Sequence, residues 1–380
     1  MKIEIRKFSE GSWENVKGSL PQSTQAQLVI AFGDTALLKE PQHLEDLRTR
    51  YPQAQIIGCS TSGNIADTTV DEGTIVATAI YFEHTQTIAT AQPIPTVEHS
   101  SQVGKTLVET LLQHPDLRHI FILAEGLHIN GSLLVEGANA ALAGRPISIT
   151  GGLAGDGTRF SETLTIFNGT ALPRQVVAIG FYGQRIKVNH GCVHGWETFG
   201  VNRKITKSIK NVVYEIDGEP ALKLYKSYLG EEHAKNLPAS GLRFPLMIHQ
   251  EGSNEPLIRT LLAVDETTQS LTFAGDVPEG NVAVLMKTNI DGLIEAAGEA
   301  ARQANLQTTQ DALAIAISCV GRRLVLTKLV EEEICAVQDT LGDQFYLTGF
   351  YSYGELAPNM TQGMCNLHNQ TMTLTTFSEE

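Results

Sequence analysis

One order of segments occurs three times in this chain, and it constrains the fold more than any single motif does. Each occurrence has an apolar strand-like run, a helix-like stretch, a second apolar run that breaks at a glycine loop, and a further strand-like run. The three occurrences begin with QLVIAFGD (27–34), RHIFILAEGLHINGS (118–132) and ALAIAISCVGRR (312–323). Such recurrence indicates an internal repeat. We therefore expect an α/β fold of mixed β-sheets flanked by helices, built from repeated strand-helix-strand-glycine loop-strand units.

The glycine loops of the three units carry the residues that we expect to bind a ligand. Loops at the carboxyl ends of parallel strands lie at one edge of a sheet, where ligands usually bind. An alternative is that the glycines only allow tight turns with positive φ. The tyrosines and carboxylates beside the glycines favour binding, because a turn does not require them. The candidate ligand-binding residues in these loops are Cys59, Ser60, Thr61, Gly152, Asp156, Tyr351, Tyr353 and Glu355.

Two further candidates lie outside the glycine loops. Arg322 follows SCVG, and its forked guanidinium suits a carboxylate, while Glu355 or Asp156 could receive an ammonium group. The alternative is an internal ion pair between Arg322 and one of those two carboxylates, which would hold the loops together. Asn369 is a ligand-binding candidate that could instead cap a turn. With these residues as the ligand set, the pocket would accept an amino acid.

The stretch HGCVHGWETFG (190–200) offers imidazole and thiol side chains close together. If the chain is extended there, His190, Cys192 and His194 project on one face, because strand side chains alternate. Three such ligands could hold a metal or a haem axial position. Satisfied polar histidines are the commoner case, so this alternative stays open. The two glycines that flank the second histidine would leave room for a flat group.

Charge and cysteine content exclude several classes of protein. The formal charge of −14 repels phosphate backbones, so we expect no nucleic-acid partner. The start of the chain lacks a signal-peptide core, and no segment approaches the roughly 20 apolar residues of a membrane helix, so we expect a cytoplasmic protein without membrane insertion. The five cysteines are scattered and form no CxxC pair, which favours reduced thiols.

The sequence carries no catalytic signature, and we expect that the protein is not an enzyme. Phosphate-binding, dinucleotide-binding, HExxH and GxSxG motifs are all missing from it. Cys59 could act as a nucleophile, but a small buried thiol before a turn is the commoner state of such a residue. No base stands beside it in the sequence.

Residues 184–311 do not repeat the three-part order and suggest a division of the chain. Within them, the stretch 213–238 predicts a strand, a turn at Asp217 and Gly218, and an amphipathic helix that starts near Pro220. Successive strands with short turns follow. The boundary falls after the helix, and we expect one ligand-sensing domain over 1–238 and another domain over 239–380.

Several stretches together resemble the FIST family, which has an N-terminal and a C-terminal region. The resemblance covers nearly the whole chain, and the two stretches nearest the end are its strongest part. It rests on GCSTSGNI (58–65), ITGGLAGDG (149–157), GCVHGWETFGVNRKITKSIKNVVYEIDGEPAL (191–222), GDVPEG (275–280), SCVGRR (318–323), GFYSYGELAPN (349–359) and LHNQTMTLTTF (367–377).

The resemblance implies a sensory module for small ligands, with amino acids proposed for some members. One subset, the NosP type, resembles this chain in standing alone, binds haem and senses nitric oxide for a separate histidine kinase or cyclic-di-GMP enzyme. The resemblance implies haem b as cofactor, with a histidine on the iron. His194 is the position that matches, with Trp196 and His190 beside the cofactor, and His190 and His128 are competitors for the iron.

Two functions therefore stand as expectations. The first is a haem-based nitric-oxide sensor that acts on a partner kinase or cyclic-di-GMP enzyme through His194. The second is an amino-acid or small-metabolite sensor without haem, in which Arg322 and Glu355 bind the ligand. A second copy of the chain is left open as a further partner.

Overall fold

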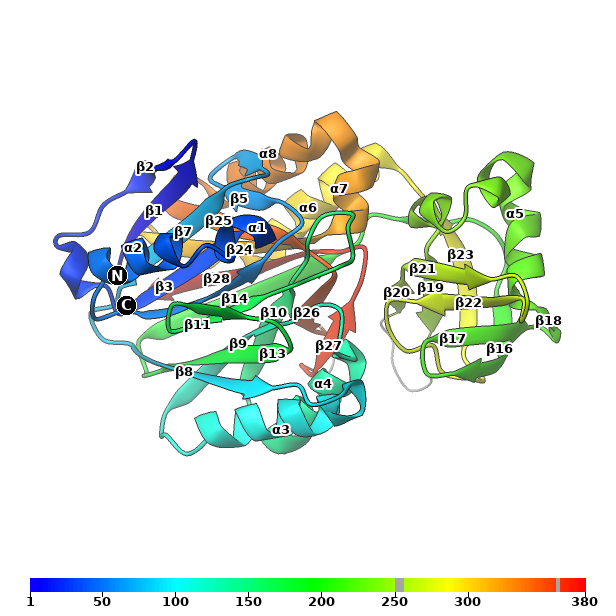
Figure 1. The fold of residues 1–380 in the computed structure, drawn as a ribbon, viewed down its shortest axis with the longest axis horizontal. Helices are drawn as coiled ribbons and strands as arrows, with labels where there is room; N and C mark the ends of the chain where they lie inside the picture. Colours follow the sequence, from blue (N-terminus) through cyan, green and yellow to red (C-terminus); the bar gives the residue numbers. More distant parts are fainter. Residues whose placement is uncertain (250–255, 360–362) are drawn as a thin grey trace.

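The computed structural model describes residues 1–249, 256–359 and 363–380, and these form two bodies of unequal size (Figure 1). The larger body holds both ends of the chain, and its termini lie close together at the end farthest from the smaller body. The smaller body comprises residues 197–287 and is inserted between two strands of the larger one. No helix in the described parts of the chain has the length and apolar character needed to cross a membrane.

Three mixed β-sheets make up the larger body. The first has the order β12(Thr170–Leu172)-β11(Thr165–Phe167)-β4(Gln55–Ser60)-β3(Leu28–Gly33)-β7(Ile75–Tyr81)-β1(Lys2–Ser9)-β2(Ser12–Gly18). The second has the order β27(Cys365–His368)-β26(Gly354–Pro358)-β10(Ser148–Leu153)-β9(Leu117–Ala124)-β13(Gln175–Tyr182)-β8(Gln86–Pro93). The third has the order β14(Ile186–Val193)-β28(Met372–Glu379)-β24(Ala312–Cys319)-β25(Phe345–Ser352)-β5(Asn64–Ala66)-β6(Thr69–Asp71). The expected α/β class with mixed sheets is confirmed.

A parallel pair lies at the centre of each sheet, and a short strand from elsewhere in the chain extends it. The parallel pairs are β3 with β4, β9 with β10, and β24 with β25. After each of these second strands the chain leaves its own sheet: β5 pairs with β25, β11 with β4, and β26 with β10. The glycine loops are therefore the crossings between sheets, which brings them together in the middle of the larger body.

Strand alternation divides the side chains of each sheet between two layers. On β3, Ile30 and Phe32 face a core shared by all three sheets, while Val29 faces outward. On β9, Phe121 faces that shared core and Ile122 faces outward. Because both of these layers are buried, the strands are apolar on both faces, which explains their nearly continuous apolar sequence.

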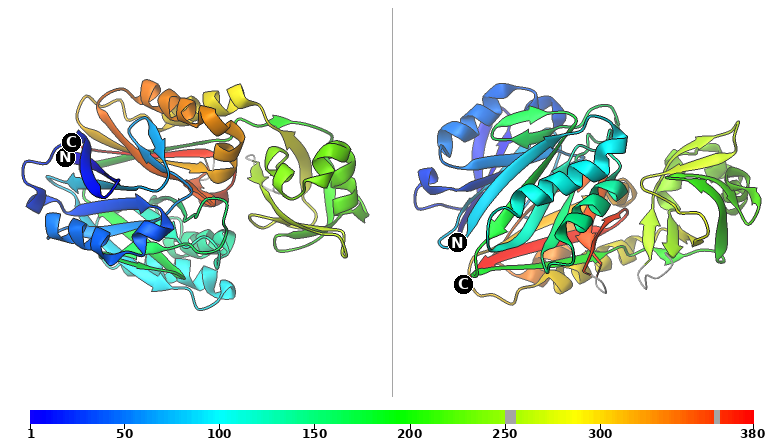
Figure 2. Two further views of the ribbon diagram at one scale, coloured as in Figure 1. Left: turned by 45° about the horizontal axis from the view of Figure 1, so that its top comes forward. Right: turned by 90° about the horizontal axis from the view of Figure 1, so that it is seen from below.

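Amphipathic helices cover the outward faces. The first sheet is covered by α1(Thr35–Leu38) and α2(Pro41–Arg50), the second by α3(Ser100–Leu111) and α4(Gly131–Leu142), and the third by α6(Ile290–Ala304) and α8(Val330–Leu341). Figure 2 shows these helices on the outside of the sheets. A short helix, α7(Val320–Leu326), follows β24 directly and lies at the side that faces the smaller body.

Glycine is required where the parallel strands approach closely. A Cβ atom on Gly58, Gly151 or Gly349 would lie 1.8 Å from the carbonyl oxygen of the neighbouring strand. Each of these positions is on the second strand of a parallel pair. Two of them, Gly151 at φ 147° and Gly349 at φ 154°, also have positive φ.

The smaller body is a twisted antiparallel sheet with one helix. Its helix α5(Ala221–Lys235) packs on the sheet, and the boundary expected after residue 238 falls inside this body, between α5 and β19. The strands are β15(Glu197–Thr198), β16(Arg203–Ile209), β17(Val212–Ile216), β18(Glu219–Pro220), β19(Leu246–His249), β20(Leu257–Arg259), β21(Leu261–Asp265), β22(Ser270–Phe273) and β23(Val282–Lys287).

Candidate ligand site between the two bodies

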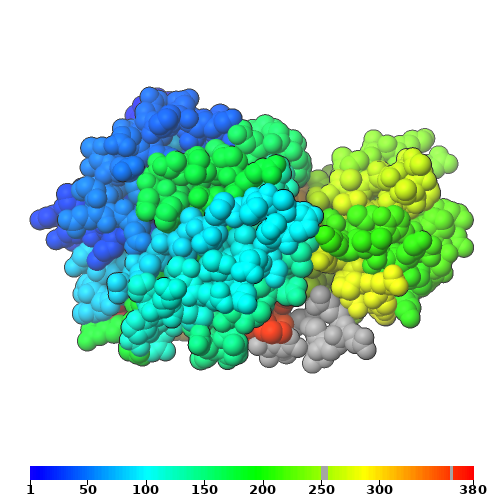
Figure 3. Space-filling model, turned by 60° about the horizontal axis from the view of Figure 1, so that its bottom comes forward, coloured from blue at the N-terminus to red at the C-terminus, as the bar shows by residue number. Residues whose placement is uncertain are grey.

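A cavity of about 360 Å³ lies where the two bodies meet. From the larger body it is lined by the loop 126–131 after β9, by Tyr353 and by residues 319–321 at the end of β24. The smaller body contributes Thr260 and the segment 273–276. The cavity lies beside the carboxyl ends of β9 and β24, the end of the sheets at which the sequence predicts a pocket. In Figure 3 the smaller body lies against one end of the larger body.

Apolar side chains form most of the wall of this cavity and remain partly open to solvent. Among the described residues, eleven large apolar side chains are exposed, and three of them line this cavity. These three are Val97, which is 39% exposed, Phe160, which is 48% exposed, and Leu262, which is 43% exposed. The ring of Phe160 stacks on that of Tyr353 with 4.5 Å between centroids and 12° between planes. Exposed apolar groups gathered at one concave site are typical of binding sites.

A few polar groups also line this cavity. The Thr260 side chain belongs to a residue that is only 5% exposed, and its Oγ1 atom has no hydrogen-bond partner within the described chain. Asn130 Nδ2 donates to Asp276 Oδ1 at 3.0 Å across the two bodies. Lys210 adds a positive charge at the wall. A buried hydroxyl without a partner has a free-energy cost, so its place at the wall favours a ligand or water as its partner.

Tyr353 and Asp156, two of the predicted ligand residues, lie in contact. The Tyr353 hydroxyl donates to Asp156 Oδ1, and its oxygen lies 3.0 Å from the carbonyl oxygen of Gly157. Asp156 Oδ2 accepts the backbone N–H groups of Ser161 and Glu162 at 2.9 and 3.0 Å. Burial acts to raise the pKa of Asp156, but these hydrogen bonds outweigh it and lower the pKa. The carboxylate therefore fixes the loop that carries Phe160, and only the tyrosine ring reaches the cavity wall.

Hydrogen bonds beside the cavity hold the two bodies together. Arg259 of the smaller body is fully buried, and its Nη1 atom donates to the carbonyl of Leu367 at 3.0 Å. Burial lowers the pKa of Arg259 to about 10, although the Asp276 charge opposes this shift. Gln370 Nε2 approaches the carbonyl of Leu242 at 3.4 Å. These polar contacts and a buried apolar cluster that includes Met286 and Leu293 together set the relative position of the two bodies.

Arg322 is not a ligand clamp in this structure. Its Nε and Nη2 atoms donate to Glu333 Oε2 at 3.1 and 2.7 Å, and its other donors reach the carbonyls of His194 and Leu293. The partner is thus neither of the carboxylates that the sequence suggested. Tyr351, predicted to bind the ligand, instead donates to Glu333 Oε1 at 2.6 Å. The three side chains form a closed and fully buried network.

Glu355 and Asn369 are buried inside the protein and line neither this cavity nor the groove described below. Glu355 accepts hydrogen bonds from Ser352 Oγ at 2.5 Å and from Thr371 Oγ1 at 2.8 Å. Burial raises the pKa of Glu355 to about 8, against the opposing effect of these hydrogen bonds. Asn369 Nδ2 donates to the carbonyl of His368, and its Oδ1 atom has no partner within the described chain. Glu355 is thus held by Ser352 and Thr371 inside the protein, and the ammonium site expected there stays a prediction.

The first half of the first glycine loop lies inside the fold, and its second half lines an opening. Cys59 faces the core shared by the three sheets, and burial raises the pKa of its thiol well above the usual value, so it is inert. Ser60 Oγ accepts the N–H group of Leu164 at 2.9 Å. Gly152 lies in the β10 ladder opposite Glu355. Thr61 lines an opening of about 150 Å³, together with Ser62, Gly63 and Asn64 of the same loop, Gly157 of the second glycine loop, and Asp34 and Arg323.

His194 does not fit a haem ligand. Its Nδ1 atom accepts the backbone N–H group of Trp196 at 3.0 Å, whereas a ligating histidine usually donates from its second nitrogen. The glycines expected to leave room for a flat group instead admit α6: a Cβ atom on Gly191 would lie 2.0 Å from the Ala300 carbonyl oxygen, and one on Gly195 would lie 2.2 Å from that of Gly292. The Cβ directions of these glycines are therefore filled by α6, while Gly195 and Trp196 line an open groove of about 850 Å³ beside that helix.

Trp196 is also held within the protein. Its indole Nε1 atom donates to the carbonyl of Gln370 at 3.0 Å, and the side chain is buried with Met286 and Leu293. It therefore anchors the start of the inserted body. His128, the third histidine considered, binds its own loop through Glu125 Oε1 at 3.2 Å.

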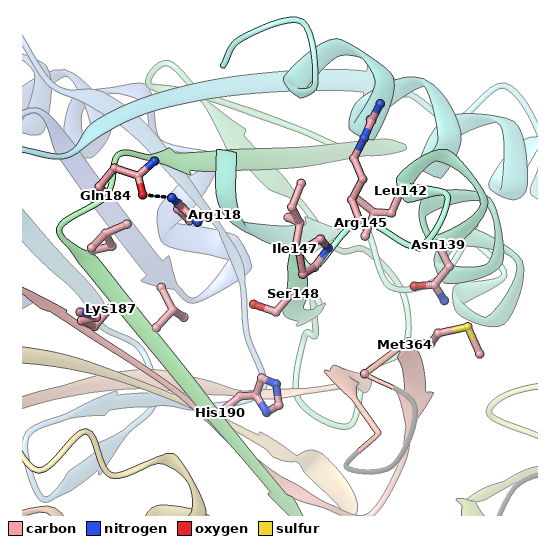
Figure 4. Close-up of a pocket in the computed structure, with 15 residues that line it drawn as sticks. Arg118, Asn139, Leu142, Arg145, Ile147, Ser148, Gln184, Lys187, His190 and Met364 are labelled. Atoms are coloured by element: carbon pink, nitrogen blue, oxygen red, sulfur yellow. Dashed lines mark hydrogen bonds between the residues drawn. The ribbon is translucent and has the colours of Figure 1, made fainter. Parts of the chain in front are cut away.

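His190 lies in a different setting, at the wall of a groove of about 860 Å³ (Figure 4). The groove runs between β14 and the end of α4, and Ser148 lies on the side opposite His190. Arg118, Arg145 and Lys187 also line it. Burial lowers the pKa of His190, so the imidazole is neutral, which is the form that binds a metal.

The cavity between the bodies contains residues that no motif predicted. No catalytic or metal-binding pattern in the sequence includes Phe160, Lys210, Thr260 or Leu262. Asp276 lies in GDVPEG, one of the stretches that carry the family resemblance. The position of Glu333 in the sequence, by contrast, does indicate that it is buried. It lies on the same helical stripe as Val330, Ile334, Val337 and Leu341, where a carboxylate among apolar residues indicates a buried partner.

The fold and this site define a ligand-binding module of mixed α/β architecture. The FIST N domain matches residues 27–219 and the FIST C domain matches residues 221–358. The chain belongs to the FIST family, whose domains are sensory ligand-binding modules. The junction between the two matched regions lies inside the smaller body.

Two relatives illustrate how far the similarity extends. An uncharacterized protein of Methanocaldococcus jannaschii, MJ1623, is 23% identical over 365 residues, which cover 90% of this chain and 68% of that protein. A crystal structure of cyanuric acid hydrolase from A. caulinodans aligns with 100% of this chain and 99% of its own, at 7% identity and a TM-score of 0.40.

Proposed function

We propose that this protein is a cytoplasmic sensory module, acting by binding rather than by catalysis, whose small-molecule ligand occupies the cavity between the two bodies. The observation that carries the proposal is the gathering of three exposed apolar side chains and one unpartnered hydroxyl, Thr260 Oγ1, at the wall of this one cavity. A ligand there would contact both bodies and would favour one relative position of them. That change of position is the signal a partner, such as a histidine kinase or a cyclic-di-GMP enzyme, would read.

A thermal-shift screen with a library of amino acids, organic acids and nucleotides tests this proposal. We expect at least one compound to raise the melting temperature of the wild type and to lose that effect in Phe160→Asp, because the variant places a charge in the apolar wall. Val201→Asp is the matched control, since Val201 is 58% exposed and lies outside the cavity wall. A stabilising compound that is indifferent to Phe160→Asp would contradict the proposal.

Haem-based sensing of nitric oxide is a second candidate, and the groove at His190 favours it. The groove offers a neutral imidazole, apolar wall residues that include Leu142 and Val188, and two arginines that could pair with propionates. When bound, the haem iron would supply the centre that binds nitric oxide. In this arrangement His190 would hold the iron and Arg118 and Arg145 would orient the group.

A haem titration followed by absorption spectroscopy distinguishes the two histidines. If haem binds in the groove, His190→Ala will weaken and broaden the Soret band, and His194→Ala will leave it unchanged. The result opposite to this would place the haem at His194. A weak band that neither variant alters would remove the haem candidate and leave the metabolite sensor.

A further inference from the structure

The charges around the inter-body cavity limit the kind of ligand that fits it. Among the described residues that line it, Lys210 is the cation and Asp276 is the carboxylate. The Oδ1 atom of Asp276 accepts from Asn130, and the buried guanidinium of Arg259 donates to the Asp276 backbone carbonyl at 3.0 Å. The Arg259 charge offsets that of the Asp276 carboxylate inside the protein. A cationic ligand would therefore meet one carboxylate in this wall, and that carboxylate already has a cation beside it.

Lys210 is in the opposite situation. It is exposed and forms no ion pair within 4.0 Å in the part of the chain that the structure describes. The pKa of Glu98, a fully exposed carboxylate on the larger body, is lowered mainly by a hydrogen bond from Thr96. The Lys210 charge adds a smaller lowering. The charge available to a ligand in this cavity is therefore positive.

The apolar side chains of the cavity wall indicate the shape of the uncharged part of the ligand. The stacked pair of Phe160 and Tyr353 presents a flat aromatic surface, and Leu262 adds an aliphatic one from the smaller body. Aromatic rings prefer offset or edge contacts with such surfaces. The unpartnered Thr260 hydroxyl can donate to an oxygen atom of the ligand.

We propose that the cavity between the two bodies binds an aromatic monoanion, a small molecule with one ring and one carboxylate. The ring lies against Phe160 and Leu262, and the carboxylate is directed to Lys210, with the Thr260 hydroxyl as a further donor. This assignment rests on the proposed function. It makes zwitterionic amino acids and amines the less favoured class, since the one carboxylate of the wall, Asp276, is already offset by the buried charge of Arg259.

Isothermal titration of the full chain with 3-phenylpropionate tests the assignment, with 3-phenylpropanamide and L-phenylalanine as probes that keep the ring and change the charge. We expect 3-phenylpropionate to bind at least tenfold more tightly than either. Lys210→Gln should weaken 3-phenylpropionate about tenfold and leave the amide unchanged. Lys207→Gln is the matched control, because Lys207 is exposed on β16, the strand just before Lys210, and pairs with Glu215 at 3.8 Å, away from the cavity.

Equal affinity for the amide or for L-phenylalanine, binding of 3-phenylpropionate that ignores Lys210→Gln, or no binding of any of the three probes would overturn the assignment. These failures are separable from failure of the proposed function. If a different compound from the metabolite screen binds in a manner that depends on Phe160, the cavity is a ligand site and only the ligand class is wrong. If no compound depends on Phe160, both are wrong.

Discussion

The network around Arg322 and the cavity between the two bodies both contain buried polar side chains, but these are fully paired in the first region and not in the second. At Arg322 the buried charges are paired, and the network of Arg322, Glu333 and Tyr351 is closed to solvent. At the cavity, Thr260 keeps a buried hydroxyl that has no partner among the residues the structure describes, and Phe160 remains half exposed. The first arrangement stabilises the fold and the second leaves polar and apolar surface for a ligand. The difference shows that residue type alone does not identify a ligand site.

The largest expected effect comes from breaking the closed network. Glu333→Ala should lower the free energy of unfolding by about 3–5 kcal/mol, because it leaves the buried Arg322 charge without its partner. Chemical denaturation measures this. Glu332→Ala, an exposed neighbour on the same helix, should change stability by less than about 0.5 kcal/mol. If both variants were equally mild, the network would not be the structural element described here.

The pH dependence of stability tests the burial of Glu355. The folded protein holds the Glu355 proton up to a pKa of about 8, while the unfolded chain loses it near the ordinary value of about 4.5, so stability falls as pH rises between these values. The decline from this group is about 1.4 kcal/mol per pH unit. Glu355→Gln should remove that decline. Identical pH profiles of wild type and variant, measured by urea denaturation from pH 5 to pH 8, would contradict the shifted pKa.

Tyr353 connects the two regions, and its hydroxyl can be removed without its ring. Tyr353→Phe should lower the free energy of unfolding by about 1–3 kcal/mol, because Asp156 loses a buried donor. Ligand affinity should fall less than in Phe160→Asp, since the ring keeps its place at the cavity wall. Thermal unfolding and titration measure the two effects separately, and a loss of affinity without any loss of stability would place the hydroxyl on the ligand instead.

The smallest expected effect is an unchanged or increased free energy of unfolding. Thr260→Val replaces the unpartnered hydroxyl by a methyl group, so the ligand-free protein should be as stable as the wild type or more stable by up to about 1 kcal/mol. Thr371→Val is the matched control and should destabilise, because its hydroxyl donates to Glu355. If Thr260→Val destabilised the protein as much as the control does, the Thr260 hydroxyl would have a partner in the fold.

The strands and most helices could be predicted from the sequence, because alternation and helical spacing are local properties. The pairings could not, since a strand such as β5 leaves the sheet of its neighbours and completes another. The candidate ligand site between the two bodies was missed for a similar reason. Lys210 and Thr260 meet Phe160 only through the way the inserted body docks, and no local pattern carries that information.

The glycines near His194 show that one sequence feature can have more than one structural cause. Gly191 and Gly195 do mark a close approach, but the group that approaches is the backbone of α6. A small residue beside a histidine fits a ligand and a packed helix equally well. The FIST resemblance, by contrast, rested on several stretches together and was confirmed by the matches over 27–219 and 221–358.

Amide hydrogen exchange with and without the most stabilising compound of the metabolite screen tests the central claim most directly. If the ligand binds between the two bodies, protection will increase in residues 126–131 and 157–160 of the larger body and in residues 260–276 of the smaller one. Protection confined to residues 144–148 and 186–190, which line the groove at His190, would contradict the claim and place the ligand in that groove.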